Sequence, residues 1–345
     1  IYAPTFTANR IKLKEYGLED KQEEFILELV NLTKKASNNK ALIAGDITMT
    51  GKQLRPVGDL ELEELIDVYK EQINYLVKAG VDLLVIETMM SLAETRAALI
   101  AAKEVCELPV MVSFTFEESG RTLFGTDPAT AAIVMESLGA SAIGVNCSSG
   151  PAQMVEIIKQ MKDVCSIPLI AKPNAGLPIM DSEGNMTYPM KAEEFAKEML
   201  ELVKAGATIL GGCCGTTPDH IKVLKETVKP AILPARIFNQ NVRYLTSERQ
   251  TLRFGLDGNF IIVGERINPT GKKAFQESVR SGSMEMVCEF AQQQEENGAA
   301  ILDVNLGMSG IDEKAKMLEA IDELSMTTAL PLAIDSSHPE VMEAA

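Results

Sequence analysis

The repeated boundaries between helical and extended patterns constrain the fold of this chain most. Gly80, Gly139 and Gly206 each follow a helical pattern and precede an apolar run, whereas Pro109 and Pro168 start the apolar runs between them. Gly80 and Gly139 are 59 residues apart, as are Pro109 and Pro168. A glycine directly after a helix can take the left-handed conformation that ends it. The equal spacing therefore predicts two consecutive units, each with two strands and two helices.

Seven short apolar runs predict strands. They are rich in β-branched residues and continuous rather than alternating, which is typical of parallel strands buried on both faces. The runs are 1–6, 41–47, 81–88, 109–116, 141–147, 168–174 and 207–213. The stretches between them, such as 62–80, have apolar residues at helical spacing with charged residues opposite. This alternation of strands and helices predicts an α/β fold with a parallel sheet.

We interpret the pattern as a (β/α)8 TIM barrel, with an open doubly wound sheet as the alternative. A doubly wound sheet that binds nucleotides carries a glycine-rich phosphate loop after its first strand, and none is visible here. Seven of eight barrel strands can be counted. The missing strand is therefore expected to be the first, upstream of Ile1.

A second, partial barrel is predicted after the first. Residues 229–259 show no clear period and little apolar clustering, which indicates a linker. Strand patterns resume at 260–271, 299–307 and 331–337, and the last two repeat the glycine and proline starts, at Gly298 and Pro331. The expected domains are a barrel lacking its first strand over 1–228, a linker over 229–259, and the beginning of a second (β/α)8 barrel over 260–345.

Composition argues against several classes of function. The net charge of −16 disfavours nucleic-acid binding. No apolar run approaches the roughly 20 residues of a transmembrane helix, so no membrane partner is expected. Six cysteines in 345 residues are too few for a disulfide framework, and a cytoplasmic location is the simplest interpretation.

Three cysteines fall at the predicted carboxyl ends of strands, where barrel enzymes place their functional residues. Cys147 ends the run 141–147, and the adjacent Cys213 and Cys214 lie at the end of the run 207–213. Strands two apart in a closed barrel are near neighbours, so the thiols are expected to converge. Three thiolates suit Zn²⁺ and leave its fourth position open, as in catalytic sites. A packing role or a redox pair is the alternative for Cys213 and Cys214.

This ligand set favours chemistry at a substrate sulfur. A Zn²⁺ ion with three thiolates activates water poorly, but it can bind a fourth thiol, lower its pKa and leave the sulfur electron-rich. Alkyl transfer to sulfur is the reaction that benefits. Glu87, at a neighbouring strand end, could bind an ammonium group or form a salt bridge at the barrel mouth. Asn174 could approach the zinc or contact the substrate.

Four segments resemble the zinc-dependent homocysteine S-methyltransferase family. They are GVNCSSGP (144–151), KPNAG (172–176), GGCCGTTPDH (211–220) and GTDP (125–128), and the likeness covers about residues 1–228. The resemblance implies that Cys147, Cys213 and Cys214 are zinc ligands and catalytic residues. It also implies that the homocysteine sulfur takes the open position and that Glu87 receives the amino group.

The second predicted barrel resembles the pterin-binding barrel of cobalamin-dependent methionine synthases. The segments VGERINPTGKKAF (263–275) and LDVNLG (302–307) carry this likeness. It places Asp335 at a pterin-contacting position, and Asn305 and Asn268 are further pterin-binding candidates at strand ends.

Together the resemblances imply the N-terminal half of such an enzyme. The first barrel would transfer methyl from methylcobalamin to the zinc-bound thiolate of homocysteine, and the second would regenerate methylcobalamin from methyltetrahydrofolate. The chain has no DxHxxG cobalamin-binding sequence, so a cobalamin-binding domain or protein is expected outside it. The alternatives are a homocysteine S-methyltransferase with another donor, such as S-methylmethionine, and a non-catalytic zinc-binding barrel.

Overall fold

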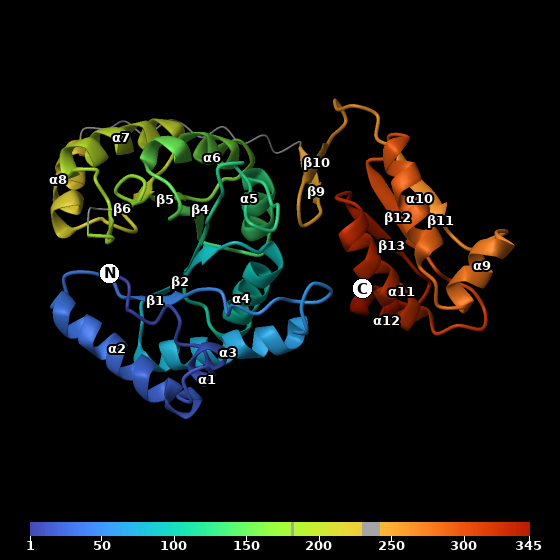
Figure 1. Ribbon diagram of the computed structural model, residues 1–345, viewed down its shortest axis with the longest axis horizontal. Helices are drawn as coiled ribbons and strands as arrows, with labels where there is room; N and C mark the ends of the chain where they lie inside the picture. Colours follow the sequence, from blue (N-terminus) through green and yellow to red (C-terminus); the bar gives the residue numbers. More distant parts are fainter. Residues whose placement is uncertain (181–182, 230–241) are drawn as a thin grey trace. The chain divides into compact units, whose positions relative to one another are not determined.

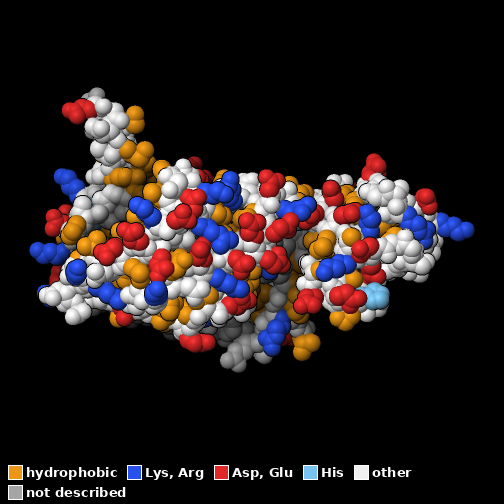
Figure 2. Space-filling view, turned by 90° about the horizontal axis from the view of Figure 1, so that it is seen from below, with side chains coloured by type: hydrophobic (Ala, Val, Ile, Leu, Met, Phe, Trp, Pro, Cys, Tyr) orange, Lys and Arg blue, Asp and Glu red, His pale blue; other side chains and the backbone are white. Residues whose placement is uncertain are grey.

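The computed structural model describes residues 1–180, 183–229 and 242–345. The chain divides into two compact units, Ile1–Phe238 and Asn239–Ala345, and each has its own hydrophobic core. Acidic and basic side chains are interspersed on the face that Figure 2 shows. None of the helices in the described ranges combines the length and the apolar character needed to cross a lipid bilayer.

The first unit is built on a parallel sheet in which each strand lies beside the next one in that sheet. In the described residues the strands are β1 (Ala44–Ile47), β2 (Leu83–Met89), β3 (Val110–Phe114), β4 (Ala142–Asn146), β5 (Leu169–Lys172) and β8 (Ile209–Leu210). A doubly wound sheet would reverse direction at a switch point, and this one does not. The sequential order is that of the predicted (β/α)8 barrel.

The first apolar run, 1–6, joins the sheet over a shorter length than predicted. Tyr2 forms a parallel bridge to Ala44 of β1, and the backbone N–H of Ala3 donates to the carbonyl of Ala44. The extended segment ends at Pro4, which has no backbone N–H to continue a ladder. The other six predicted runs each contain a strand of the sheet.

Helices connect the strands and surround them in Figure 1. They are α1 (Arg10–Lys14), η1 (Glu19–Lys21), α2 (Gln22–Ser37), α3 (Leu62–Ala79), α4 (Leu92–Val105), α5 (Pro128–Ser137), α6 (Pro151–Val164), α7 (Ala192–Ala205) and α8 (Pro218–Val228). In α3, Leu65, Tyr69 and Leu76 are fully buried because helical spacing brings them to one face. Gly80 ends this helix with φ of +74°, as the sequence predicted.

A small antiparallel hairpin lies between β5 and α7. Its strands are β6 (Ile179–Met180) and β7 (Met186–Thr187). Ile179, Met180 and Met186 are exposed, so this hairpin adds little to the core. Tyr188, which follows β7, places its side chain against Gly215 of the loop that contains the two adjacent cysteines.

The second unit contains the three parallel strands that the sequence predicted. They are β11 (Val263–Ile267), β12 (Ile301–Asn305) and β13 (Leu332–Asp335). The helices of this unit are α9 (Lys273–Arg280), α10 (Glu285–Glu296), α11 (Glu313–Thr327) and α12 (Pro339–Ala344). Phe275, Leu302 and Leu324 are fully buried and come from α9, β12 and α11, so the helices pack on the sheet around one core.

The segment 229–259 contains structure that the sequence did not predict. An antiparallel hairpin pairs β9 (Arg243–Thr246) with β10 (Thr251–Phe254), and it belongs to the second compact unit. The hydroxyl of Ser247 accepts hydrogen bonds from the backbone N–H groups of Arg249 and Gln250, which closes the turn. The two strands are too short and too polar to stand out as apolar runs.

The close approach of β4 and β5 yields a prediction about stability. A Cβ added to Gly144 of β4 would lie 2.0 Å from the carbonyl oxygen of Ile170 in β5. Gly144→Ala should therefore lower the free energy of unfolding by about 1–3 kcal/mol, the usual cost of overpacking. Denaturant titration measures this change.

Gly45→Ala is the matched control because it adds the same methyl group to strand β1. There the new atom would meet only side-chain carbons of Leu76, at 3.0 Å or more, and that side chain can move. Equal unfolding midpoints for the two variants would contradict the predicted backbone clash.

Candidate metal and substrate site

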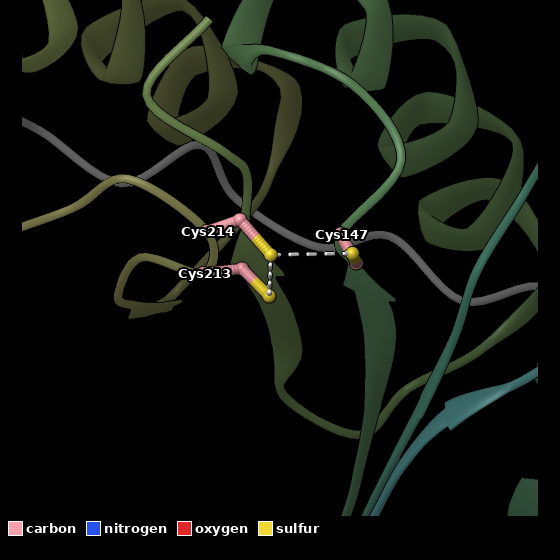
Figure 3. Close-up of side chains that lie close together, drawn as sticks. All are labelled: Cys147, Cys213 and Cys214. Atoms are coloured by element: carbon pink, nitrogen blue, oxygen red, sulfur yellow. Dashed lines mark hydrogen bonds between the residues drawn. The ribbon is translucent and has the colours of Figure 1, made fainter. Parts of the chain in front are cut away.

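The three cysteines predicted to bind a metal lie together at the carboxyl ends of the strands (Figure 3). Cys147 directly follows β4, and Cys213 and Cys214 lie in the loop between β8 and α8. The sulfur of Cys214 is 3.9 Å from that of Cys147 and 4.0 Å from that of Cys213. All three sulfurs lie within 4.8 Å of one another. The structure therefore brings together the predicted ligand set.

The spacing of the sulfurs fits a tetrahedral zinc site. At a Zn–S distance of ~2.3 Å, two tetrahedral ligands are about 3.8 Å apart. Two of the three sulfur–sulfur distances, 3.9 and 4.0 Å, are close to this value. Small side-chain movements would place all three sulfurs around one ion, with a fourth position left for another ligand.

The thiols cannot all ionise easily without a cation. A hydrogen bond from the Cys213 thiol, the largest of several effects, lowers the pKa of Cys147 to about 6. The same hydrogen bond, together with burial, raises the pKa of Cys213 well above its usual range. One sulfur thus ionises at the expense of its neighbour. A divalent cation would remove this conflict, because a thiol bound to a metal is deprotonated.

Backbone contacts to one intervening strand fix the two cysteine loops. The N–H of Cys147 donates to the carbonyl of Lys172 at 3.1 Å, and the N–H of Cys213 donates to the carbonyl of Pro173 at 2.8 Å. Both acceptors lie at the end of β5, which stands between β4 and β8 in the sheet. Cys147 and Ser148 have φ of +63° and +65°, a region that residues other than glycine rarely adopt.

The helix after the cysteine pair begins as the sequence predicted. Thr217 is the N-cap of α8 and Pro218 is its first residue. Nδ1 of His220 lies 2.9 Å from Oγ1 of Thr217, and Nε2 lies 3.0 Å from the carbonyl of Met190. Both ring nitrogens are therefore engaged, and His220 is a capping residue. A helix N-terminus near the cysteine loop favours thiolates.

Asn174 lies beside the sulfur cluster. Its amide oxygen accepts a hydrogen bond from the backbone N–H of Cys214 at 3.0 Å, and its side chain helps to lower the pKa of Cys147. Asn174 is buried, and the N–H of Ala175 donates to the carbonyl of Cys214. The amide oxygen thus holds the Cys214 loop against the end of β5.

Glu87, the predicted ammonium-binding residue, takes part in a buried ion pair. Its carboxylate contacts the ammonium group of Lys172, and the two side chains are only 10% and 11% exposed, respectively. The same ammonium lies 3.9 Å from the centre of the Tyr2 ring, at cation–π distance. The salt bridge that the sequence left open is therefore present. A substrate ammonium would have to share Glu87 with Lys172 or displace Lys172.

Asp46, near the end of β1, adds a second buried carboxylate beside the ion pair of Glu87 and Lys172. It is 7% exposed, and its Oδ1 has no hydrogen-bond partner among the described residues. Burial and, next, the charge of Glu87 raise the pKa of Asp46 to about 8. Two carboxylates thus face the single ammonium of Lys172. Such a group is suited to a cationic ligand, since an added positive charge would let Asp46 ionise.

In the second unit, Asn305 and Asp335 lie together and Asn268 does not join them. Nδ2 of Asn305 donates to Oδ2 of Asp335 at 2.9 Å, where β12 and β13 end side by side. Both residues line a cavity of about 480 Å³, along with Glu313. Asn268 instead donates to Oε1 of Glu265 at 2.8 Å and is not among the residues that line the cavity.

Lys172 is a site residue that the sequence analysis missed. A signal was available, because a charged residue within the apolar run 168–174 would be buried and would need a partner. What the sequence did not indicate is the identity of that partner, since Glu87 lies 85 residues earlier in the chain.

Comparison with known families agrees with this geometry. The family described as homocysteine S-methyltransferase matches residues 1–228. The chain belongs to this family. The family described as pterin binding enzyme matches residues 264–345. Both predicted modules are thus confirmed in the predicted order, and so is the enzyme class, a methyltransferase.

Individual relatives match the whole chain. The methionine synthases of Mycobacterium tuberculosis and Mycobacterium leprae are each 28% identical to it, over 352 and 358 residues that cover 99% of the chain. The chain spans 29% of the length of these relatives.

Solved structures confirm the barrel. The homocysteine methyltransferase MmuM from Escherichia coli aligns in its oxidised form with a TM-score of 0.55 and in its metallated form with 0.54. Each is 22% identical, and each alignment covers 65% of this chain and 78% of the other. At this identity the likeness shows the fold alone.

The buried carboxyl of Asp46 predicts a pH dependence of stability. The folded state holds the proton up to about pH 8, whereas the unfolded chain releases it near pH 4. Stability should therefore fall as the pH rises between these values, by at most about 1.4 kcal/mol per pH unit for one proton. Asp46→Asn, which cannot ionise, should remove this loss.

Denaturant unfolding at pH 5 and pH 8.5 measures the effect, with Asp20→Asn as a control at an exposed position. The unsubstituted chain should lose more free energy of unfolding between pH 5 and pH 8.5 than Asp46→Asn does. The variant should therefore be relatively more stable at pH 8.5 than at pH 5. A difference in stability between the two chains that is the same at both pH values would show that Asp46 ionises normally in the folded protein.

Proposed function

We propose that the first unit binds Zn²⁺ through Cys147, Cys213 and Cys214 and transfers a methyl group to the sulfur of homocysteine, forming methionine. The convergence of three sulfurs, two pairs of them 3.9 and 4.0 Å apart, is the observation that supports this proposal. Bound there, the ion would lower the pKa of a substrate thiol and hold it as a thiolate. Membership of the homocysteine S-methyltransferase family supports the substrate.

The residues around the sulfurs have distinct roles in this proposal. Cys147, Cys213 and Cys214 hold the ion, and Asn174 keeps the Cys214 loop in place. Glu87 binds the ammonium group of homocysteine, and Asp46 adds a second carboxylate to the same charged group. Lys172 forms an ion pair with the Glu87 carboxylate, which the substrate ammonium would share or replace. Sulfur and ammonium are thus recognised by different parts of the barrel mouth, which orients the substrate.

We further propose that methylcobalamin donates the methyl group and that the second unit regenerates it from methyltetrahydrofolate. The match of residues 264–345 to the pterin binding enzyme family supports the folate step. Asp335 and Asn305, which line the 480 Å³ cavity, would contact the pterin. The cobalamin-binding domain or protein would lie outside this chain.

Metal binding is the first test. The chain should hold about one Zn²⁺, and addition of homocysteine should release about one proton, because a metal-bound thiol is deprotonated. Cys214→Ala should lose both the zinc and the proton release. Elemental analysis and calorimetry in buffers of different ionisation enthalpy measure these quantities.

Cys288→Ala is the control for this test, because Cys288 lies in α10 of the second unit. It should keep zinc and proton release unchanged. If Cys214→Ala retained one zinc per chain, the ligand assignment would be wrong. If the unsubstituted chain bound zinc but released no proton with homocysteine, the site would be structural rather than catalytic.

The donor is tested separately for each unit. With zinc and homocysteine present, methylcobalamin should yield methionine and S-methylmethionine should not. Asp335→Asn should weaken the binding of methyltetrahydrofolate by about tenfold, the usual effect of losing one hydrogen bond to a charged group. Glu296→Gln, at an exposed position of α10, serves as the control. Turnover with S-methylmethionine, or an unchanged affinity of Asp335→Asn for methyltetrahydrofolate, would contradict the proposed route.

A further inference from the structure

We infer that Asn146 is a positioning residue that couples the sulfur site to the ammonium site of the first unit. The inference rests on the proposed function, because it concerns how the two ends of the substrate are held. Asn146 is the last residue of β4, directly before Cys147, and it is fully buried. Its side chain contacts residues from both sites.

The side-chain amide of Asn146 has all of its bonding positions engaged. Its Oδ1 accepts from the backbone N–H of Thr88 at 2.9 Å and from Oγ of Ser113 at 2.7 Å. Its Nδ2 donates to Oγ1 of Thr88 at 2.8 Å and lies 4.0 Å from the sulfur of Cys213. A backbone N–H can only donate, so its contact with Oδ1 fixes the orientation of the amide. Nδ2 must then face Cys213.

The two bonds to Thr88 act on the ammonium site. Thr88 follows Glu87 directly and has φ of +59°, which is a strained conformation for a β-branched residue. The pairing of β2 with β3 shifts register between Ile86 and Met89, so Glu87 and Thr88 lie in an irregularity of the strand. Such irregularities re-aim side chains. By holding both the N–H and the hydroxyl of Thr88, Asn146 fixes the direction of the Glu87 carboxylate.

The other contacts of Asn146 act on the sulfur site. Its carbonyl accepts a hydrogen bond from Oγ1 of Thr115 at 3.0 Å, which anchors the backbone just before Cys147 turns to positive φ. Its Nδ2 faces the sulfur of Cys213. One buried residue thus joins the segment of Glu87 to the sulfur site: its side chain contacts Thr88 and faces Cys213, and its backbone anchors the chain before Cys147. A substrate that carries both a thiol and an ammonium group requires the separation between the two sites to be fixed.

The test compares two thiols that differ by one group. Homocysteine has an α-amino group, and 4-mercaptobutyrate has the same chain without it. The dissociation constant of 4-mercaptobutyrate is divided by that of homocysteine, both measured by calorimetry on the zinc-loaded 345-residue chain. A large ratio means that Glu87 favours the thiol that carries the ammonium group. Asn146→Ala should lower this ratio by about tenfold while zinc remains at one per chain, since the loss is that of one well-placed charged contact.

Two further variants separate coupling from general damage. Ser113→Ala removes one bond to Asn146 and leaves its contacts with Thr88 and Cys213, so it should keep the original ratio. In a Glu87→Gln background, Asn146→Ala should change the ratio by less than about twofold, because the carboxylate it positions is gone. Asn146→Ser repeats the Asn146→Ala measurement with a polar side chain at the buried position, in case the alanine variant loses zinc.

The outcomes are distinguishable. An unchanged ratio in Asn146→Ala, or an equal fall in the Glu87→Gln background, overturns the coupling. Loss of zinc from both Asn146→Ala and Asn146→Ser, with Ser113→Ala still loaded, also overturns it by assigning Asn146 to the metal site alone. Failure of the proposed function shows earlier, in the unsubstituted chain, as absent zinc or as equal affinity for the two thiols.

Discussion

The position of β5 between β4 and β8 is the constraint on which the site depends. Parallel strands end at the same edge of a sheet, so residues that follow them meet there whatever their separation in sequence. Cys147 and Cys213 each donate a backbone hydrogen bond to the end of β5, at Lys172 and Pro173. The sulfurs are therefore brought together by the sheet itself, before any ion binds. An ion that bound there, as proposed, would find its ligands already ordered, which would reduce the entropy cost of binding.

Lys172 links this geometry to the charge of the barrel mouth. Its backbone carbonyl holds the Cys147 loop, and its side chain neutralises one of two buried carboxylates. Burying Glu87 and Asp46 without a cation would be costly, and one ammonium cannot satisfy both. The protein meets the remaining cost by keeping Asp46 protonated. A substrate ammonium would supply a further positive charge, so the surplus of buried carboxylates would favour a cationic ligand.

The sequence predicted the parts of this fold that leave a periodic or compositional signature. Strands buried on both faces require continuous apolar runs, and glycine after a helix marks where each helix ends, so the order of the barrel could be predicted. The hairpin of β9 and β10 could not, because short strands with polar residues have no such signature. The ion pair of Glu87 and Lys172 depends on β2 and β5, which lie three positions apart in the sheet, and no local pattern records that relationship.

Residues with positive φ in the first unit differ between helix ends and the proposed site. Where the chain only needs to turn, it uses residues that tolerate positive φ, such as Gly80 and Asn38 at helix ends. Thr88 and Cys147 adopt the same region at the barrel mouth, where glycine would be less strained. Glycine at either position would remove the hydroxyl that contacts Asn146 or the sulfur that joins the cluster. The strain is therefore maintained where the side chain is needed, and the bonds of Asn146 are what stabilise it at Thr88.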